Sequence, residues 1–188
     1  MKKRFTGLLI TIMLAAALFG CGKTTDSVKT ENEGLTVVTT LFYQYDFVKE
    51  IAGDHANVEL LLRPGQESHS YEPTPADVIR IQDADIFIYN GGVAEAWVEK
   101  VLEGLDTDQV EVICMMDSID TVEEEIVEGM EEEHDEDDHD QAEYDEHIWT
   151  SPVNAQKLVQ VISGAVRKAD PENDSDYRDR SEKYISKL

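Results

Sequence analysis

Short apolar runs of strand character alternate with segments of helical spacing through most of this chain of 188 residues. The expected strands are 35–40, 58–62, 85–90 and 110–115, and the expected helices are 42–53, 75–81, 93–105 and 152–169. Strands that alternate with helices form parallel β-α-β units, and strands that are apolar throughout are covered by helices on both faces. The sequence therefore predicts an α/β fold, a single three-layer lobe with about four parallel strands.

The same alternation predicts where a site would lie, because ligands of open α/β sheets bind beyond the carboxyl ends of the strands. A length of 188 residues suits one ordinary domain or two small ones. We expect the lobe to span residues 35–172. Residues 173–188 are expected to form a further amphipathic helix, which carries Tyr177, Tyr184 and Ile185.

The first 20 residues are typical of a secretory signal peptide. Basic residues precede an apolar run from Gly7 to Phe19, which is shorter than the roughly 20 residues of a membrane span. The run ends in Leu-Phe-Gly-Cys, a pattern similar to a bacterial lipobox, in which cleavage precedes the cysteine. We expect Cys21 to carry lipid and residues 21–34 to form a flexible tether, so that the protein is anchored on the extracytoplasmic face of the cell membrane. An ordinary signal peptide with an incidental cysteine is the alternative.

Acidic residues far outnumber basic ones: 41 Asp and Glu against 16 Lys and Arg give a formal net charge of -25. This balance argues against a nucleic-acid partner, because phosphate is bound by Lys and Arg. Such a field attracts cations instead.

Much of the acidic excess lies in residues 123–146, which contain His134 and His139 but no Lys or Arg. Self-repulsion and the shortage of apolar side chains favour an exposed loop here. The two histidines stand among carboxylates, and we expect them to capture metal weakly and transiently. A solvated acidic linker is the alternative interpretation.

Motifs of the common enzyme classes are missing. The chain contains no H-E-x-x-H, no G-x-S-x-G, no Walker loop and no G-x-G-x-x-G. Cys114 ends an expected strand and has no C-x-x-C partner, so we expect a buried apolar side chain there and not a nucleophile. The sequence therefore indicates a protein that is not an enzyme.

Two further histidines occupy informative places in the expected fold. His69 lies in the connection between the strand 58–62 and the helix 75–81, where α/β folds place their sites. His147 stands just after the acidic stretch and before the helix 152–169. Neutral imidazole is a good ligand for zinc, whereas calcium and magnesium prefer oxygen ligands.

Both histidines lie in stretches that are similar to a known family. In chain order these stretches are 37–43 with 47–53, 60–65, 69–75 (HSYEPTP), 81–85, 89–92 (YNGG) and 145–155 (DEHIWTSPVNA). With these motifs in the right order, residues 35–188 resemble the N-terminal half of the metal-specific solute-binding proteins of ABC importers, the cluster that handles zinc and manganese.

The resemblance implies that His69 and His147 are metal ligands and that the fold is one half of a two-lobed solute-binding protein. The family adds a third His and a carboxylate or water from a second lobe that this chain does not contain, so two ligands alone would bind zinc weakly. Residues 173–188 would begin the helix between the lobes. We expect a monomer that hands its metal to a membrane permease and, through it, works with an ATPase.

The chain departs from the family in two places. The loop 123–146 is more acidic than the His-rich loop of zinc importers. Ser68 stands where some zinc-type members have a carboxylate, so we expect no carboxylate ligand from this lobe. We expect zinc because such a loop is present, with a manganese-binding homologue as the alternative. A surface adhesin or divalent-cation buffer is the rival function, in which the acidic loop matters and the two histidines do not.

Overall fold

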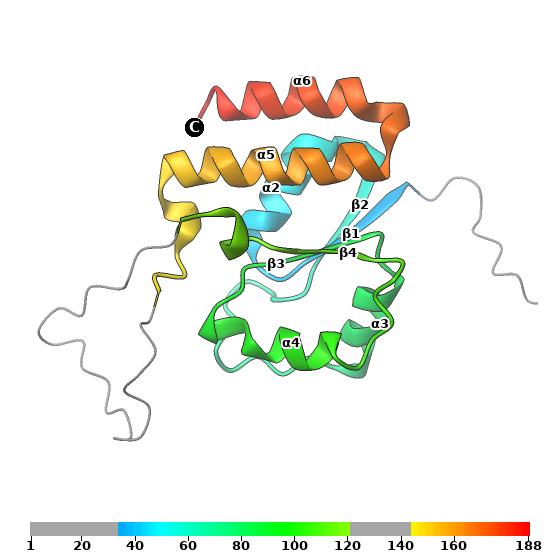
Figure 1. Cartoon of the computed structure of the whole chain (residues 1–188), viewed down its shortest axis with the longest axis vertical. Coiled ribbons are helices and arrows are strands. Elements are labelled where there is room, and N and C mark those ends of the chain that lie inside the picture. Colours follow the sequence, from blue (N-terminus) through cyan, green and yellow to red (C-terminus); the bar gives the residue numbers. More distant parts are fainter. Residues whose placement is uncertain (1–33, 121–143) are drawn as a thin grey trace, which may run out of the picture. The chain divides into compact units, whose positions relative to one another are not determined.

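Four parallel strands in the order β2-β1-β3-β4 form the central sheet of the structure, a computed structural model that describes residues 34–120 and 144–188 (Figure 1). The strands are β1 (Leu35–Thr39), β2 (Ala56–Leu60), β3 (Ile86–Tyr89) and β4 (Glu111–Cys114). In register, Val37 of β1 lies opposite Val58 on one side and Ile86 on the other. The predicted α/β fold with a parallel sheet is confirmed.

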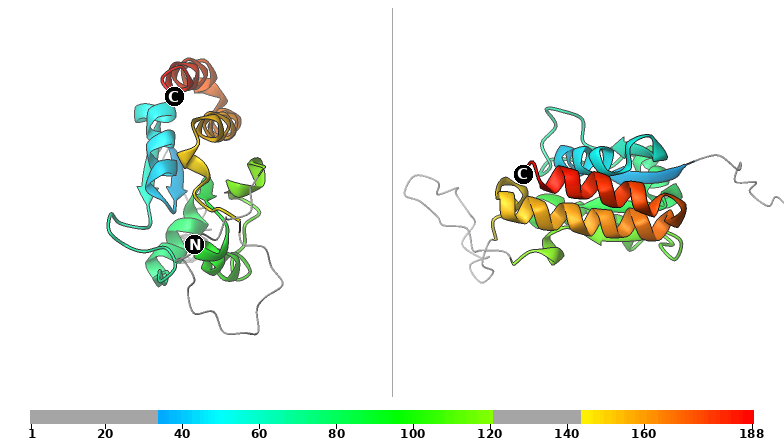
Figure 2. Two further views of the ribbon diagram at one scale, coloured as in Figure 1. Left: turned by 90° about the vertical axis from the view of Figure 1, so that its left-hand side faces the viewer. Right: turned by 90° about the horizontal axis from the view of Figure 1, so that it is seen from above.

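Helices cover both faces of this sheet (Figures 1 and 2). They are α2 (Phe42–Ala52), α3 (Pro75–Asp83), α4 (Ala96–Leu102), α5 (Pro152–Ala169) and α6 (Asp174–Ile185). Because successive strand side chains face opposite sides of a sheet, Val37 and Val38 enter different cores. Val37 joins the core formed with α2 and α5, and Val38 joins the core formed with α3 and α4. The result is a three-layer arrangement.

Helix α6 packs against both α2 and α5, and it runs beside α5 in each view (Figures 1 and 2). Its Tyr177 side chain is fully buried in the core of α2 and α5. At the far end of α2, Nε2 of His55 lies 3.1 Å from Oδ2 of Asp176. A helix within residues 173–188 is therefore present, and its role between two lobes stays a prediction.

Most elements begin and end within two residues of the expected bounds, and two differ in a way that has a structural reason. Strand β2 spans 56–60 instead of 58–62, because its register with β1 begins at Ala56, and an edge strand tolerates the exposed Asn57 that follows. The expected helix 93–105 is a 3-10 helix η3 (Val93–Glu95) followed by the shorter α4.

Several predictions from the sequence fall outside the described residues. These are the signal peptide, the lipid-bearing Cys21, nearly all of the tether, and the acidic-loop histidines His134 and His139. Among the helices of residues 34–120 and 144–188, none is both long and apolar enough to cross a membrane.

Candidate metal-binding site

The connections that carry the two candidate ligands leave the sheet at the carboxyl ends of its strands. The chain passes from β1 to β2 on one side and then to β3 on the other, so the topological switch point lies between β1 and β3. Ligand sites of open α/β sheets lie in the crevice outside this point. His69 follows β2, and residues that follow β1 and β3 contact the segment that carries His147.

His69 lies in the long connection from β2 to α3, here called the His69 loop (residues 61–74). The N–H of Tyr71 donates to the carbonyl of Ser68 (3.1 Å), so His69 is the second residue of a tight turn. Its side chain is exposed. Its ring makes no hydrogen bond or ion pair within residues 34–120 and 144–188, so no contact there fixes which ring nitrogen carries the lone pair.

The carboxyl-terminal part of the His69 loop is tied to the helices behind it. The ring of Tyr71 packs edge-on against Trp97 of α4, with centroids 5.1 Å apart. Thr74 begins α3 with a capping box, because its N–H donates to Oδ2 of Asp77 (2.8 Å) while its Oγ1 accepts from the N–H of Asp77 (3.3 Å). Burial alone would raise the pKa of Asp77, but the hydrogen bonds from Thr74 outweigh it and lower that pKa.

His147 lies in the segment that leads into α5, here called the His147 segment (residues 144–151). Oδ1 of Asp145 accepts the backbone N–H of His147 (2.8 Å) and lies 3.0 Å from Nδ1 of its ring. An ionised carboxylate only accepts hydrogen bonds, so this contact places the ring proton on Nδ1. Nε2 then keeps the lone pair that a metal ion requires, and the side chain is 68% exposed.

The His147 segment is held at the switch point by contacts on both sides of its histidine. Before it, the side-chain amide of Asn90 donates to the carbonyl of Glu146 (3.1 Å). After it, the ring of Trp149 stacks on Tyr43 of α2, with centroids 4.5 Å apart and planes 13° apart. The segment is thus fixed to residues that follow β1 and β3.

A buried polar cluster supports these contacts from behind. Asn90 is 2% exposed, and the hydroxyl of Tyr43 donates to its Oδ1 (2.8 Å). Oε2 of the buried Glu95 accepts the backbone N–H groups of Asn90 (2.6 Å) and Gly91 (3.1 Å). Burial raises the pKa of Glu95, although hydrogen bonds from Thr40 and from these backbone groups lower it in part. The cluster therefore sets the path of the chain directly after β3.

The structure therefore supports one candidate ligand more fully than the other. His147 has a partner that orients its ring, and His69 is exposed on a loop that leaves the same edge of the sheet. Within residues 34–120 and 144–188, no group of three or more His, Cys, Asp and Glu side chains is placed to hold a metal ion. That the two rings share one ion stays a prediction.

Sequence reasoning missed the residues that position the His147 segment, namely Tyr43, Asn90, Glu95 and Glu146. One signal was present: Asn-Gly-Gly after a strand favours a turn with positive φ, and φ is 92° at Gly91 and 81° at Gly92. Nothing in the sequence distinguishes Glu95 from the many exposed acidic residues, because its burial follows from the fold alone.

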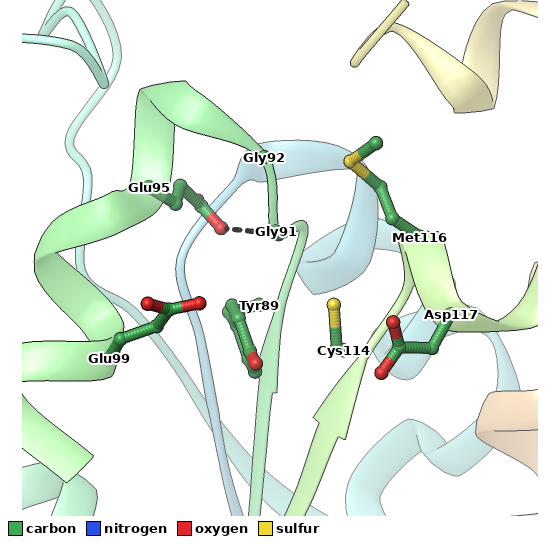
Figure 3. Close-up of a pocket in the computed structure, with 8 residues that line it drawn as sticks. All are labelled: Tyr89, Gly91, Gly92, Glu95, Glu99, Cys114, Met116 and Asp117. Carbon is green, nitrogen blue, oxygen red and sulfur yellow. Dashed lines mark hydrogen bonds between the residues drawn. The ribbon is translucent and has the colours of Figure 1, made fainter. Parts of the chain in front are cut away.

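A pocket of about 360 Å³ lies beyond the carboxyl ends of β3 and β4 (Figure 3). It is lined by Tyr89, Gly91, Gly92, Glu95, Glu99, Cys114, Met116 and Asp117. Cys114 is half-buried, not fully buried as expected, and its Sγ donates to the carbonyl of Asn90 (3.5 Å). Burial raises the pKa of this thiol, which disfavours the reactive thiolate.

Comparison with known sequences identifies one family. The sequence model of the periplasmic component A of zinc-uptake complexes, ZnuA, matches residues 37–188. The high-affinity zinc uptake system protein ZnuA of Bacillus subtilis is 38% identical over 194 residues, which cover 100% of this chain and 59% of that protein. The manganese-binding lipoprotein MntA of Halalkalibacterium halodurans is 30% identical, with 100% and 56% covered.

Solved structures agree with the sequence matches. The crystal structure of Zn(II)-bound AdcA from Streptococcus pneumoniae superposes with a TM-score of 0.67 and 36% identity, and the match covers 82% of this chain and 30% of that one. The chain thus spans less than two thirds of the length of each of these relatives.

Proposed function

Because the chain belongs to the ZnuA family, we propose that it is the extracytoplasmic substrate-binding component of an ABC importer, which captures zinc and delivers it to a membrane permease and its ATPase. This family consists of metal-binding transport components and not of enzymes. His69 and His147 are the ligands that this part of the protein supplies.

The observation that carries the proposal is the orientation of the His147 ring. A histidine that ligates a metal usually donates its second ring N–H to a carboxylate or carbonyl, which fixes the tautomer and makes the ligating nitrogen more basic. Asp145 is placed to do this for Nδ1, so Nε2 is the nitrogen offered to the ion. This geometry lies at the switch point, where α/β sheets bind their ligands.

Zinc is the metal that we propose as substrate. Imidazole nitrogen is a preferred ligand for zinc. Because the two histidines bind in their neutral form, they do not neutralise the charge of the ion, which is still attracted by the acidic surroundings. A relative in the same family is named for manganese, so the matching titration with Mn²⁺ belongs to the test. Within residues 34–120 and 144–188 no third His, Cys, Asp or Glu side chain joins the two histidines, and we propose that the remaining ligands are water or residues of a second lobe, as the resemblance implies.

Histidine variants test the assignment directly. We expect His69→Ala and His147→Ala each to weaken zinc binding at least tenfold in competition with a chelating dye. His55→Ala is the matched control, because His55 also contacts a carboxylate, Asp176 (3.1 Å). His55 directly precedes β2 and so lies at the amino ends of the strands, away from the candidate ligands. Equal loss in all three variants, or none in the first two, would contradict the proposal.

Membrane anchoring at Cys21 is part of the proposed function. A relative, MntA, is named a lipoprotein, and the lipobox-like sequence ends at this cysteine. Cells fed labelled fatty acid should label the wild-type protein and leave Cys21→Ser unlabelled. Release of the wild-type protein into the medium without label would refute the anchor.

The acidic loop is proposed to raise the local zinc concentration through His134 and His139. Deletion of residues 123–143 should lower zinc uptake, and it should lower affinity less than His147→Ala does. If neither uptake nor affinity changes, the loop is only a solvated linker.

Growth at low zinc distinguishes an importer component from the alternative function, a surface adhesin. A strain without the protein should grow poorly when zinc is scarce and recover with added zinc, whereas loss of an adhesin leaves growth unchanged.

A further inference from the structure

Glu146, the residue directly before His147, is fixed at both its side chain and its backbone. Its carboxylate accepts the N–H groups of Val93 and Ala94, the latter at 3.2 Å from both oxygens. Its carbonyl accepts the amide of Asn90 (3.1 Å). All of these partners belong to the connection between β3 and α4, here called the β3–α4 loop (residues 90–95).

The β3–α4 loop is shaped to receive this carboxylate. The first N–H groups of the 3-10 helix η3 have no acceptor within their own turn, and the carboxylate of Glu146 fills that place. Gly92, just before it, has φ 81° and ψ -175°, a conformation that is essentially restricted to glycine. A Cβ at this position would overlap the carboxylate of Glu146, so only glycine allows the approach.

The contact also explains why Asn90 is buried in a polar cluster. Its side chain bridges Tyr43 and Glu146, since Oδ1 accepts from the tyrosine hydroxyl (2.8 Å) while the amide donates to the Glu146 carbonyl. Glu95 accepts the backbone N–H of the same residue (2.6 Å). The backbone of His147 is thus joined through one residue to a buried, hydrogen-bonded framework.

We propose that Glu146 and Asn90 are positioning residues, which hold the His147 segment on the β3–α4 loop and thereby set the affinity of His147 for its metal ion. The proposal rests on the proposed function. Asp145 sets the tautomer and rotation of the ring, whereas Glu146 and Asn90 set where the backbone that carries the ring lies. Both oxygens of Glu146 accept backbone N–H groups, so the carboxylate is already engaged in holding the β3–α4 loop.

Three substitutions at one position separate positioning from charge. Glu146→Gln keeps an oxygen that accepts from Val93 and Ala94 but removes the negative charge. Glu146→Asp keeps the charge but withdraws the oxygens by one methylene group. We expect Glu146→Asp and Glu146→Ala to weaken zinc binding about tenfold and Glu146→Gln to restore most of the affinity, because acceptor geometry matters here. If Glu146 acts as a ligand or through its field, the order of the Gln and Asp variants reverses.

A spectroscopic readout without metal keeps the test independent of zinc. In the full chain with Trp97→Phe, the remaining tryptophan is Trp149, which stacks on Tyr43 and has its ring centroid 5.5 Å from that of His147. Its emission should shift to the red in Glu146→Asp and Glu146→Ala, as the ring leaves Tyr43, and stay unchanged in Glu146→Gln. Glu99→Ala, which removes a nearby exposed carboxylate of α4, is the control and should change neither emission nor affinity.

The outcomes distinguish this inference from the proposed function. If His147→Ala abolishes zinc binding while Glu146→Asp binds as tightly as Glu99→Ala, the positioning role is wrong and the function stands. If His147→Ala itself binds zinc normally, the proposed function fails. Should Glu146→Ala not fold, the Asp and Gln pair decides alone, because each changes only reach or charge.

Discussion

The two connections that carry the candidate ligands are held in different ways. The His147 segment is fixed by residues distant in the chain, through Asn90, Ala94 and the ring of Tyr43. The His69 loop is bonded to the rest of the protein at its two ends, where Leu61 donates to Thr39 and Thr74 pairs with Asp77. Between these ends, the backbone hydrogen bonds of residues 63–71 are made among themselves, and the ring of Tyr71 contacts Trp97. One candidate ligand is therefore preorganised, while the other lies on a loop that depends on local bonds.

The difference predicts how the energy of metal binding is divided. Fixing the backbone of one residue costs about 1–2 kcal/mol in conformational entropy, and the His147 segment meets this cost on folding. The His69 loop meets more of it when the ion binds. Substitutions that loosen the supports of the His147 segment should then lower both stability and affinity, whereas similar changes in the His69 loop should have smaller effects.

The largest contrast is expected between two glycines with positive φ, one in each region. Gly92→Ala forces alanine into a glycine-only conformation and displaces the carboxylate of Glu146, which should cost about 3 kcal/mol of unfolding free energy. Gly65→Ala, at φ 89° in the His69 loop, meets no atom within 4 Å and should cost about 1 kcal/mol. Urea unfolding of both variants checks the difference, and equal losses would remove the contrast.

The orientation of the His147 ring provides the next largest effect. Asp145→Ala removes the acceptor of Nδ1, which should lower zinc affinity about tenfold or more without unfolding the chain. Asp145→Asn, whose amide oxygen can still accept, should lose less. Asp176→Ala, which frees His55 from its carboxylate, is the control and should leave zinc affinity unchanged. A dye-competition titration measures all three, and a normal Asp145→Ala would show that the ring needs no orientation.

The order of strands and helices followed from hydrophobic patterning, because each strand is an apolar run bounded by turns. The expected helix 42–53 ends as α2 does, at Gly53 with φ 57°. The start of the edge strand β2 was missed, since Ala56 and Asn57 enter it through pairing with β1 and not through their own propensity.

The candidate ligands could be found in the sequence, but their supports could not. His69 and His147 stand in motif-like stretches, whereas the role of Glu146 exists only because the β3–α4 loop presents N–H groups to it. Among fifteen acidic residues in 123–147, local sequence does not single out this one. Positioning contacts join residues more than 50 places apart, such as Asn90 and Glu146, and depend on tertiary structure.

A smaller difference in unfolding free energy is expected between Phe variants of two tyrosines, Tyr43 behind the His147 segment and Tyr71 in the His69 loop. Tyr43→Phe keeps the stack with Trp149 but removes the hydroxyl that donates to the buried Oδ1 of Asn90, which should cost about 1–2 kcal/mol. Burial and the neighbouring Asp77 raise the pKa of Tyr71 to about 12, so its hydroxyl stays protonated at neutral pH. Because Tyr71 is only half-buried, Tyr71→Phe should lower the free energy of unfolding by less than about 1 kcal/mol. Thermal or urea unfolding compares the two, and a larger loss in Tyr71→Phe would reverse the comparison.

The smallest expected effect is a pair of opposite pH dependences. The pKa of Asp77 is lowered in the folded state, so its capping of α3 stabilises the protein above the ordinary value of 3.8 and is lost as pH falls through the lowered pKa. Asp77→Asn should cost about 1 kcal/mol at neutral pH and progressively less in acid.

Glu95, behind the His147 segment, should behave in the opposite way. Because burial raises its folded-state pKa, the neutral acid is favoured in the folded protein, and stability falls as pH rises from the ordinary value of 4.5 through the raised pKa. Glu95→Gln stays uncharged while its amide oxygen can still accept from Asn90 and Gly91, so its stability relative to the wild type should increase with pH over that range. Urea unfolding from about pH 3 to 7 measures both trends. We expect the stability relative to the wild type to fall with pH in Asp77→Asn and to rise with pH in Glu95→Gln. These opposite signs require that hydrogen bonding dominates the pKa of Asp77 and that burial dominates the pKa of Glu95. If both relative stabilities changed with pH in the same direction, the two regions would not differ in how they hold their carboxyl groups.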